Sequence, residues 1–251
     1  MKVFVVGAGG AIGRRLVPQL TDHGHEVVAL TRSEQKRGQI ESQGARAVIA
    51  DALDHDAVMK AVTEAEPEAI IHEATALAGS LDMRKFEQTF EMTNRLRTEG
   101  TRNLLDAGEA VSVQKFVAQS FAGWPYARIG GPVKAEDDPL DPDPPAAVRT
   151  TMDAIRALES MVTSATWTDG IALRYGGFYG PGTSLSTEAD AEQSEMIRKR
   201  RFPIVGDGRG RIVDMDQGQD PSAVADDREA PLADHLRLLG LGLGAERGAG
   251  A

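Results

Sequence analysis

Apolar residues in the first 32 positions form two short continuous runs separated by a helical spacing. The runs are residues 2–6 and 27–30, and both are rich in valine. Between them, Leu16, Val17 and Leu20 recur at the spacing of one helix face. Short apolar runs indicate buried strands, and a period near 3.6 residues indicates an amphipathic helix. The opening segment therefore predicts a strand, a helix and a second, parallel strand.

The same alternation of apolar runs and helical spacings continues to about residue 175. It predicts further strands at residues 45–50, 69–72, 114–118 and 170–174, and helices at 34–44, 57–65, 82–110 (with an interruption at Gly100) and 146–164. Strands that alternate with helices indicate an α/β fold, a Rossmann-type doubly wound parallel sheet with helices on both faces. We assign this domain to residues 1–180 and expect residues 181–251 to form a small substrate-side region that is reduced, incomplete or disordered.

A glycine cluster, Gly7-Ala-Gly-Gly-Ala-Ile-Gly13, follows the first apolar run directly. Gly7, Gly10 and Gly13 are three positions apart, and each has a separate use. One allows a tight turn, one lets backbone N–H groups approach a pyrophosphate, and one packs the helix closely on the strand. Ala11 and Ile12 lie within this turn, at the positive end of the helix dipole, and we expect them to bind the cofactor as well. The alternative is a structural turn that holds no ligand.

Polar and small residues follow the other predicted strands where each one ends. They are Arg32, Asp51, Ala74, Ser120 and Tyr175. Ligands of open parallel sheets bind beyond the carboxyl ends of the strands, so these residues and the glycine turn predict one site. His72 at the end of the fourth strand is read as a structural hydrogen-bonding residue rather than a ligand or base.

Arg32 decides the expected cofactor. A site that prefers NAD places a carboxylate after the second strand, whereas a guanidinium there can pair with the 2′-phosphate of NADP. We therefore expect NADP, with NAD as the alternative. Arg14 could assist, and Arg37 is read as a solvated surface charge. Asp51 could accept a hydrogen bond from the adenine amino group, or it could cap the next helix, a role for which Asp54 competes.

Composition excludes several classes of function. The chain has 251 residues and a formal net charge of −10, which disfavours binding to nucleic acid or to anionic membranes. It contains no cysteine, so thiolate catalysis and cysteine–zinc sites are excluded. The aspartates between residues 137 and 143 alternate with prolines and indicate a solvated loop rather than a metal site. A cytoplasmic protein is expected, without a signal peptide or membrane span.

These motifs together resemble the extended short-chain dehydrogenase/reductase superfamily, the group of NAD-dependent epimerases and dehydratases. The resemblance covers residues 2 to 208. It rests on the glycine turn, Asp51, Asn94, Ser120 and the segments Ile71-His-Glu-Ala-Thr-Ala76, Gly100-Thr-Arg-Asn-Leu-Leu105, Leu173-Arg-Tyr-Gly-Gly-Phe-Tyr-Gly-Pro-Gly182 and Pro203-Ile-Val-Gly-Asp-Gly208. It implies that the glycines hold the pyrophosphate, that Asp51 lies by the adenine and that Ala74 lines the ribose. Ser120 would orient the substrate oxygen, and Tyr175 would approach the nicotinamide. Ala52, Thr75, Ala76 and Asn94 complete the implied cofactor-binding set.

The chain lacks the Tyr-x-x-x-Lys pair that serves as acid and base in the family. The helix after the Ser120 strand reads Arg149-Thr-Thr-Met-Asp-Ala-Ile-Arg-Ala-Leu-Glu159 and contains neither residue. A free phenol titrates near pH 10, so a tyrosine needs a nearby cation to act as a base at neutral pH. Tyr126 is the candidate replacement, with Lys134 as its cation, and a packing or lid role is the alternative.

The sequence therefore predicts hydride transfer between NADP(H) and a carbonyl or carbinol carbon of a small substrate, such as a nucleotide sugar or another polar molecule. The epimerase or dehydratase variant would use the same step transiently. The alternative is a catalytically inactive NADP(H)-binding sensor or scaffold, which the missing Tyr/Lys pair favours. The resemblance also implies a homodimer that pairs through the helices at 82–110 and 146–164.

Overall fold

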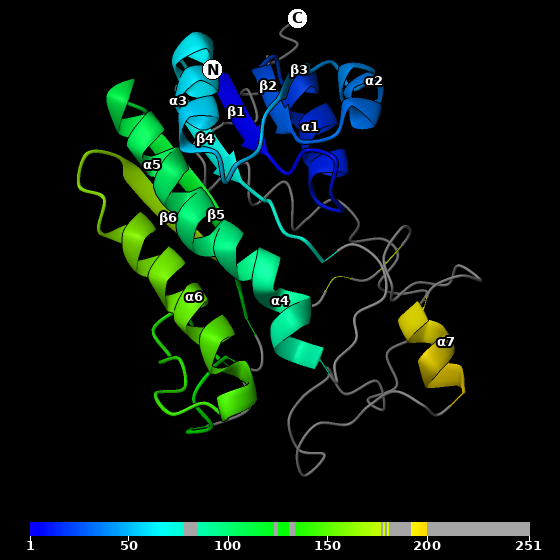
Figure 1. Cartoon of the computed structure of the whole chain (residues 1–251), viewed down its shortest axis with the longest axis vertical. Helices are drawn as coiled ribbons and strands as arrows, with labels where there is room; N and C mark the ends of the chain where they lie inside the picture. The colour runs from blue at the N-terminus through cyan, green and yellow to red at the C-terminus, as the bar shows by residue number, and fades with distance from the viewer. Residues whose placement is uncertain are drawn as a thin grey trace, which may run out of the picture.

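The computed structural model describes residues 1–77, 85–122, 125–130, 134–176, 178, 180 and 192–199. Its centre is one parallel six-stranded sheet with the order β3-β2-β1-β4-β5-β6 (Figure 1). The strands are β1 (Lys2–Val6), β2 (Glu26–Thr31), β3 (Arg46–Ile49), β4 (Ala69–His72), β5 (Lys115–Phe121) and β6 (Asp169–Tyr175). The predicted Rossmann-type fold is confirmed.

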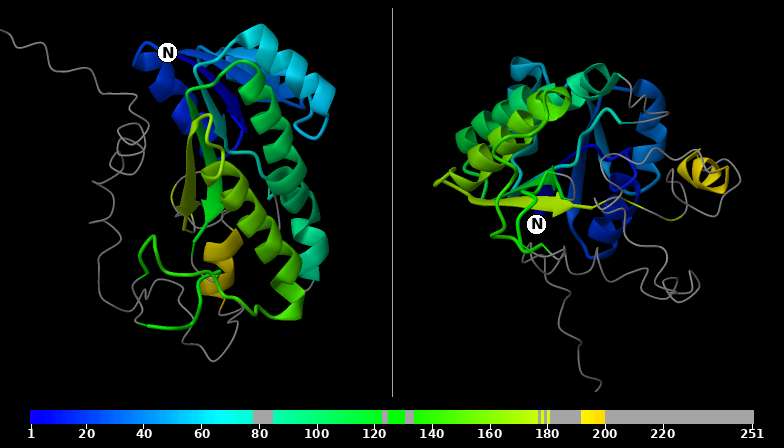
Figure 2. Two further views of the ribbon diagram at one scale, coloured as in Figure 1. Left: turned by 90° about the vertical axis from the view of Figure 1, so that its left-hand side faces the viewer. Right: turned by 90° about the horizontal axis from the view of Figure 1, so that it is seen from below.

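Helices cover both faces of the sheet (Figure 2). The helices that pack on the sheet are α1 (Gly13–Asp22), α2 (Arg37–Glu41), α3 (His55–Ala65), α5 (Thr101–Ala110) and α6 (Ala146–Thr163). The structure also describes α4 (Phe86–Arg95), which packs on α6, and α7 (Glu192–Arg198), which lies apart from the sheet (Figure 1). One core cluster joins α1 and α2 to side chains such as Val3, Val5 and Val27 of the sheet. The other cluster joins α3, α5 and α6 to the opposite side chains, such as Phe4, Ile70 and Phe116. Side chains of a strand alternate between faces, so each strand contributes to both clusters.

The helical region after β4 differs from its prediction at Gly100. The sequence predicts an interruption there, but α4 continues through a π-helical segment, Leu96–Gly100, directly into α5. A side chain on Gly100 would lie 3.7 Å from the carbonyl oxygen of Ala52. That distance is an ordinary van der Waals contact, so Gly100 lies beside the backbone after β3 and does not break the helix.

The carboxyl ends of all six strands lie at one edge of the sheet, because the strands are parallel. The strand order reverses between β1 and β4, which is the switch point where ligands bind in such sheets. Strands β5 and β6 are longer than predicted, so Ser120 lies within β5 and Tyr175 is the last residue of β6. All the predicted strand-end residues are at this edge.

Two expectations from the sequence concern the region after residue 180 and the absence of a membrane span. The predicted substrate-side region at residues 181–251 lies outside the described residues, apart from 192–199. Among the helices that the structure describes, none is both long enough and apolar enough to span a membrane.

Candidate functional site

The glycine turn between β1 and α1 is closed by backbone contacts that leave no room for side chains. Gly7 has a φ of +99°, and a Cβ there would lie 2.6 Å from the carbonyl carbon of Glu73. A Cβ on Gly13 would lie 2.4 Å from the carbonyl oxygen of Gly7. Gly10 is exposed, and its N–H donates to the Gly7 oxygen at 2.9 Å. The first and third glycines thus permit the turn and the helix packing, and the second leaves the backbone open to a ligand. These residues fit a dinucleotide pyrophosphate.

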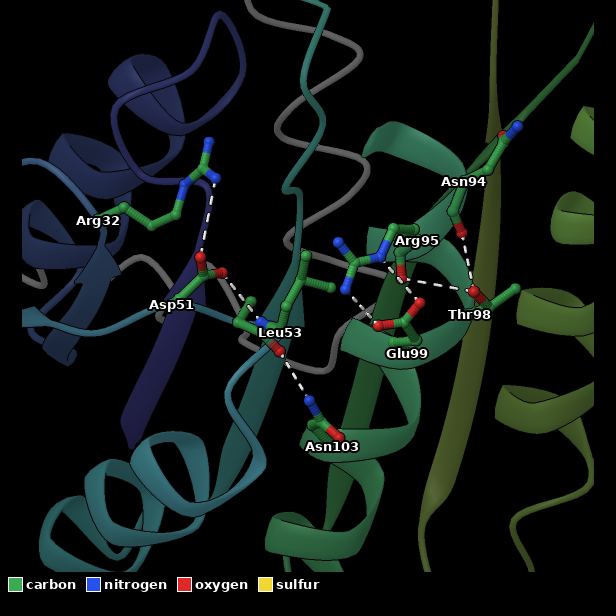
Figure 3. A network of polar contacts seen from close by, with 9 residues as sticks. Arg32, Asp51, Leu53, Asn94, Arg95, Thr98, Glu99 and Asn103 are labelled. Atoms are coloured by element: carbon green, nitrogen blue, oxygen red, sulfur yellow. Dashed lines mark hydrogen bonds and ion pairs between the residues drawn. The ribbon is translucent and has the colours of Figure 1, made fainter. Parts of the chain in front are cut away.

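Arg32 and Asp51 lie together at the other end of the predicted dinucleotide site (Figure 3). The distance from Arg32 Nη1 to Asp51 Oδ2 is 3.8 Å, and the two side chains are 55% and 41% exposed. Asp51 Oδ1 accepts the N–H of Leu53 at 3.0 Å, while Asp54 caps α3 by accepting the N–H of Ala57. The capping role considered for Asp51 therefore belongs to Asp54, and Asp51 remains available beside Arg32.

Lys36 is a second cation near the glycine turn, and sequence reasoning did not select it. Its Nζ lies 3.5 Å from the place that a Cβ on Gly9 would take. The neighbouring Arg37 instead pairs with Glu34 at 2.6 Å and with Glu41 at 3.9 Å. Arg37 is thus a surface ion-pair residue, as predicted, whereas Lys36 and Arg32 are the cations on this side of the site.

Asn103 ties α5 to this edge of the sheet (Figure 3), and Asn94 joins two helices. Asn103 on α5 donates to the carbonyl oxygen of Ala52 at 3.0 Å. Asn94 on α4 is buried, and its Nδ2 donates to Thr151 Oγ1 on α6 at 3.0 Å. Asn94, which the resemblance assigns to the cofactor, therefore also connects α4 with α6.

Residues 74–76 continue from β4 with small side chains along the same edge. Ala74 and Ala76 are half-buried, and Thr75 is exposed. The N–H of Ala76 donates to Thr93 Oγ1 at 3.0 Å. Small side chains here leave the backbone accessible, as the resemblance requires of residues that line a ribose.

Ser120 donates its only hydroxyl proton to a carboxylate on α6. The distance from Ser120 Oγ to Glu159 Oε1 is 2.5 Å, and Ser120 is 1% exposed. Glu159 also accepts from Arg174 at 2.8 Å through Nε and at 2.9 Å through Nη2. This bidentate pair raises the pKa of Arg174 and fixes the carboxylate. In this arrangement the oxygen of Ser120 offers lone pairs to a ligand rather than a proton.

Tyr126 lies against a cation, but this cation is not Lys134. The guanidinium carbon of Arg174 is 5.2 Å from the centre of the Tyr126 ring. Lys134 Nζ donates instead to the carbonyl oxygen of Ile129 at 2.5 Å. Lys134 is therefore not the cation beside Tyr126, and the arginine that takes its place cannot itself shuttle a proton.

The helix α6 carries neither tyrosine nor lysine, and its inner face is apolar. Its buried residues are Thr151, Met152, Ala154, Ile155, Leu158 and Val162. On the face of α6 that packs on the sheet, the only side chain with a proton on a polar atom is therefore the hydroxyl of Thr151.

Two buried titratable side chains follow one another at the end of β4. His72 is 2% exposed, its Nε2 contacts the carbonyl oxygen of Leu96 at 3.2 Å, and burial lowers its pKa to about 4. It is a neutral, structural histidine, which agrees with its reading from the sequence. Glu73 is 6% exposed and accepts the hydroxyl of Tyr175 at 3.1 Å.

Sequence reasoning passed over Glu73, Lys36 and Glu159. Glu73 had a visible signal, because a carboxylate stands directly between an apolar strand and a run of small residues. Lys36 and Glu159 had none, since each belongs to a polar stretch whose individual members cannot be ranked without their neighbours in space.

Comparisons with known proteins agree with this geometry. The sequence profile of a family described as NAD(P)H-binding matches residues 7–181. The chain is 38% identical over 233 residues to a 3-diazoavenalumate denitrifying reductase from a Streptomyces species, covering 92% of this chain and 73% of the relative. It is 28% identical over 215 residues to the 2-alkyl-3-oxoalkanoate reductase of Stenotrophomonas maltophilia, covering 84% and 60% of the two chains.

Among solved structures, the NAD complex of the Thermus thermophilus UDP-glucose 4-epimerase matches with a TM-score of 0.59 and 25% identity. This chain spans 62% of that protein, and the match covers 80% of this chain. The match confirms the resemblance to epimerase/dehydratase-type enzymes that the motifs predicted. The chain spans less than two thirds of both the epimerase and the oxoalkanoate reductase.

Proposed function

Because the chain belongs to the NAD(P)H-binding family, we propose that it is an NADP(H)-dependent reductase of a small molecule. The observation that carries the proposal is the glycine turn, whose contacts at Gly7 and Gly13 exclude side chains where the chain enters α1, and the N-terminus of a helix favours an anion such as a pyrophosphate. The turn would hold the pyrophosphate, and Asp51 would lie by the adenine. Bound NADPH supplies a hydride from its nicotinamide ring.

NADP is favoured over NAD because two cations lie on the side of the site where the 2′-phosphate would be. Arg32 follows β2, and the Nζ of Lys36 lies beside the glycine turn. A phosphate can accept charge-assisted hydrogen bonds from both. Asp51 partly offsets the charge of Arg32 from a distance of 3.8 Å. The Arg32 side chain is still 55% exposed, so an anion can reach it.

Titrations with NADPH and NADH test this assignment. We expect NADPH to bind more tightly, and we expect Arg32→Asp and Lys36→Ala each to weaken NADPH by about 10- to 100-fold with little effect on NADH, because hydrogen bonds to charged groups contribute about 1.5–3 kcal/mol. Arg37→Ala is the matched control, since Arg37 is paired with Glu34. Equal affinities of the parent protein for both nucleotides would remove the NADP assignment.

The hydride acceptor predicted from the sequence is a carbonyl carbon, or a carbinol carbon in the reverse direction. One relative, named as an oxoalkanoate reductase, supports it. Carbonyl reduction requires a proton as well as a hydride. The hydroxyl of Ser120 donates its hydrogen bond to Glu159, and α6 has no tyrosine or lysine, so neither Ser120 nor α6 supplies the proton donor that the family places here.

A diazo compound is the second candidate acceptor, and the absence of the Tyr/Lys pair from α6 favours it. The relative from Streptomyces is named for denitrifying a diazo compound. Hydride addition to an aryl diazonium cation yields the arene and dinitrogen, and this balance needs no proton. The loss of the Tyr/Lys pair would then carry no catalytic penalty.

The experiment that separates these acceptors follows NADPH oxidation with a panel of ketones and 3-oxo acids and, separately, with aryl diazonium salts, with dinitrogen measured by mass spectrometry. Dinitrogen release in step with NADPH oxidation identifies the diazo reductase, and alcohol formation identifies the carbonyl reductase. A protein that binds NADPH tightly and oxidises it with neither panel would be the sensor or scaffold instead, and the reductase proposal would fall.

A further inference from the structure

Among the residues that the structure describes, Glu73 is the only buried residue with a carboxyl group, and it directly follows β4 beside the glycine turn. Its N–H donates to the carbonyl oxygen of Val6 at 2.8 Å, so its backbone continues the pairing of β4 with β1. A Cβ on Gly7 would lie 2.6 Å from the carbonyl carbon and from the carbonyl oxygen of Glu73. The carboxyl group therefore belongs to a residue packed directly against the turn that would hold the pyrophosphate.

Tyr175 reaches Glu73 from the far side of β5. Its hydroxyl donates to Glu73 Oε1 at 3.1 Å, across 102 positions of sequence. The second oxygen, Glu73 Oε2, is buried and has no hydrogen-bond partner among the described residues. Burial raises the pKa of Glu73 to about 8, and the Tyr175 hydrogen bond lowers it only in part. The carboxyl group therefore holds a proton at neutral pH, and Oε2 is the oxygen left to carry it.

Among the described residues, no cation on the elements around Glu73 forms an ion pair with its carboxyl group. His72 points to the opposite face, where burial keeps it neutral, and Arg97 lies on that face too, with a pKa lowered to about 10 by its burial. On α1, Arg14 and Arg15 are exposed, and Lys36 lies beside Gly9. The pKa of Glu73 responds to its burial and to Tyr175, which itself has a raised pKa because of its burial and the neighbouring carboxyl group.

The strand order places Glu73 on the nicotinamide side of the predicted dinucleotide site. Arg32 and Asp51 follow β2 and β3, on one side of β1. Glu73 and Tyr175 follow or end β4 and β6, on the other side. A dinucleotide spans the switch point between β1 and β4, so with its adenosine at Arg32 and Asp51 its second nucleoside lies over β4 to β6.

We propose that Glu73, held by Tyr175, is a proton site that matches its charge to the nicotinamide ring: protonated beside the neutral reduced ring and ionised beside the cationic oxidised ring. The inference rests on the proposed cofactor. An opposite charge within a few ångströms of a desolvated carboxyl group lowers its pKa by about 1–3 units. Binding of NADP⁺ should therefore expel the Glu73 proton into the solvent, whereas binding of NADPH should leave it in place.

Isothermal titration calorimetry of the full chain tests this linkage from about pH 6 to pH 9 in two buffers that differ in ionisation enthalpy. We expect the affinity for NADP⁺ to rise by up to about tenfold per pH unit below pH 8 and then to level off, with about 0.4 to 0.9 proton released per NADP⁺ at pH 7 for a shift of about 1–3 units. The affinity for NADPH should lack this rise. The 2′-phosphate and pyrophosphate are common to both nucleotides, so their own titration cancels in the comparison.

Glu73→Gln should remove both the extra pH dependence and the proton release while retaining NADPH binding, because an amide keeps an acceptor for Tyr175 but cannot ionise. Glu64→Gln, which changes an exposed carboxylate on α3, is the matched control and should behave as the parent. If the Glu73→Gln variant does not fold, Tyr175→Phe decides: loss of the hydrogen bond to Glu73 raises the pKa of that carboxyl group and should move the rise in NADP⁺ affinity to higher pH, and an unmoved pH profile would overturn the inference.

The outcomes separate the two proposals. Failure of both nucleotides to bind would overturn the proposed function. Binding of both with the same pH dependence, or without proton release for NADP⁺, would overturn the assignment of Glu73 and leave the reductase proposal standing. Retention of the proton release in Glu73→Gln would assign the proton to another group and would equally overturn the inference.

Discussion

Replacing Glu73 with glutamine should change how the stability of the free protein depends on pH, with no nucleotide present. The pKa of Glu73 rises from its ordinary value of 4.5 to about 8 in the folded protein because the carboxyl group is buried. Below pH 4.5 this carboxyl group is protonated in both the folded and the unfolded chain. As the pH rises, the unfolded chain ionises first, and folding then requires the carboxylate to take up a proton. The stability that Glu73 contributes is therefore present in acid and is lost towards pH 8.

The size of this effect on the free energy of unfolding follows from the pKa shift of Glu73. Each unit corresponds to about 1.4 kcal/mol, so the complete shift corresponds to about 5 kcal/mol. Glutamine does not titrate, so the variant should gain about 3 kcal/mol of unfolding free energy relative to the parent between about pH 5 and pH 7. The comparison with the variant is essential because His72 has the opposite slope. Its pKa falls from 6.5 to about 4 through burial, so the stability it contributes is present above pH 6.5 and is lost as the pH falls through 4.

Urea unfolding followed by far-ultraviolet circular dichroism, at half-unit pH steps, measures this difference. Parent and variant should diverge steadily as the pH rises and should run parallel above about pH 8, where the parent carboxyl group is ionised in both states. Curves that stay parallel from acid to neutral pH would show that Glu73 is not protonated in the folded protein. That result would also remove the basis for its proposed coupling to the nicotinamide charge.

Three further predictions concern the framework of the site. Gly13→Ala should destabilise the fold by several kcal/mol and abolish nucleotide binding, since its Cβ would lie 2.4 Å from a backbone oxygen; Gly38→Ala, with nothing within 4 Å, is the control and should leave the melting temperature unchanged or slightly raised. Glu159→Gln should cost about 2 kcal/mol in urea unfolding, because Arg174 loses its bidentate partner, and an unchanged midpoint would refute that role. Asp54→Ala should cost about 1 kcal/mol through loss of the α3 cap, which thermal unfolding can measure.

Local patterns determined the architecture of this protein and the edge at which its site lies. Apolar runs and helical spacings predict the strands and helices, and parallel strands necessarily end at a common edge. The glycine spacing predicts the turn, and the contacts at Gly7 and Gly13 show why only glycine fits. The error at Gly100 arose because glycine is a weak helix former, whereas here the packing of buried neighbours such as Leu96 and Leu104 keeps the helix continuous.

The tertiary structure alone decided which side chains meet at that edge. Lys36, rather than Arg37, lies beside the glycine turn. The hydroxyl of Ser120 donates a hydrogen bond to Glu159, and that of Tyr175 donates one to Glu73, which is 102 positions away in the sequence. Such contacts depend on strand register, side-chain direction and burial, which no local periodicity contains. The protonation of Glu73 is the clearest case, because a glutamate is an ordinary anion in the chain and becomes a neutral acid only where packing has removed its water.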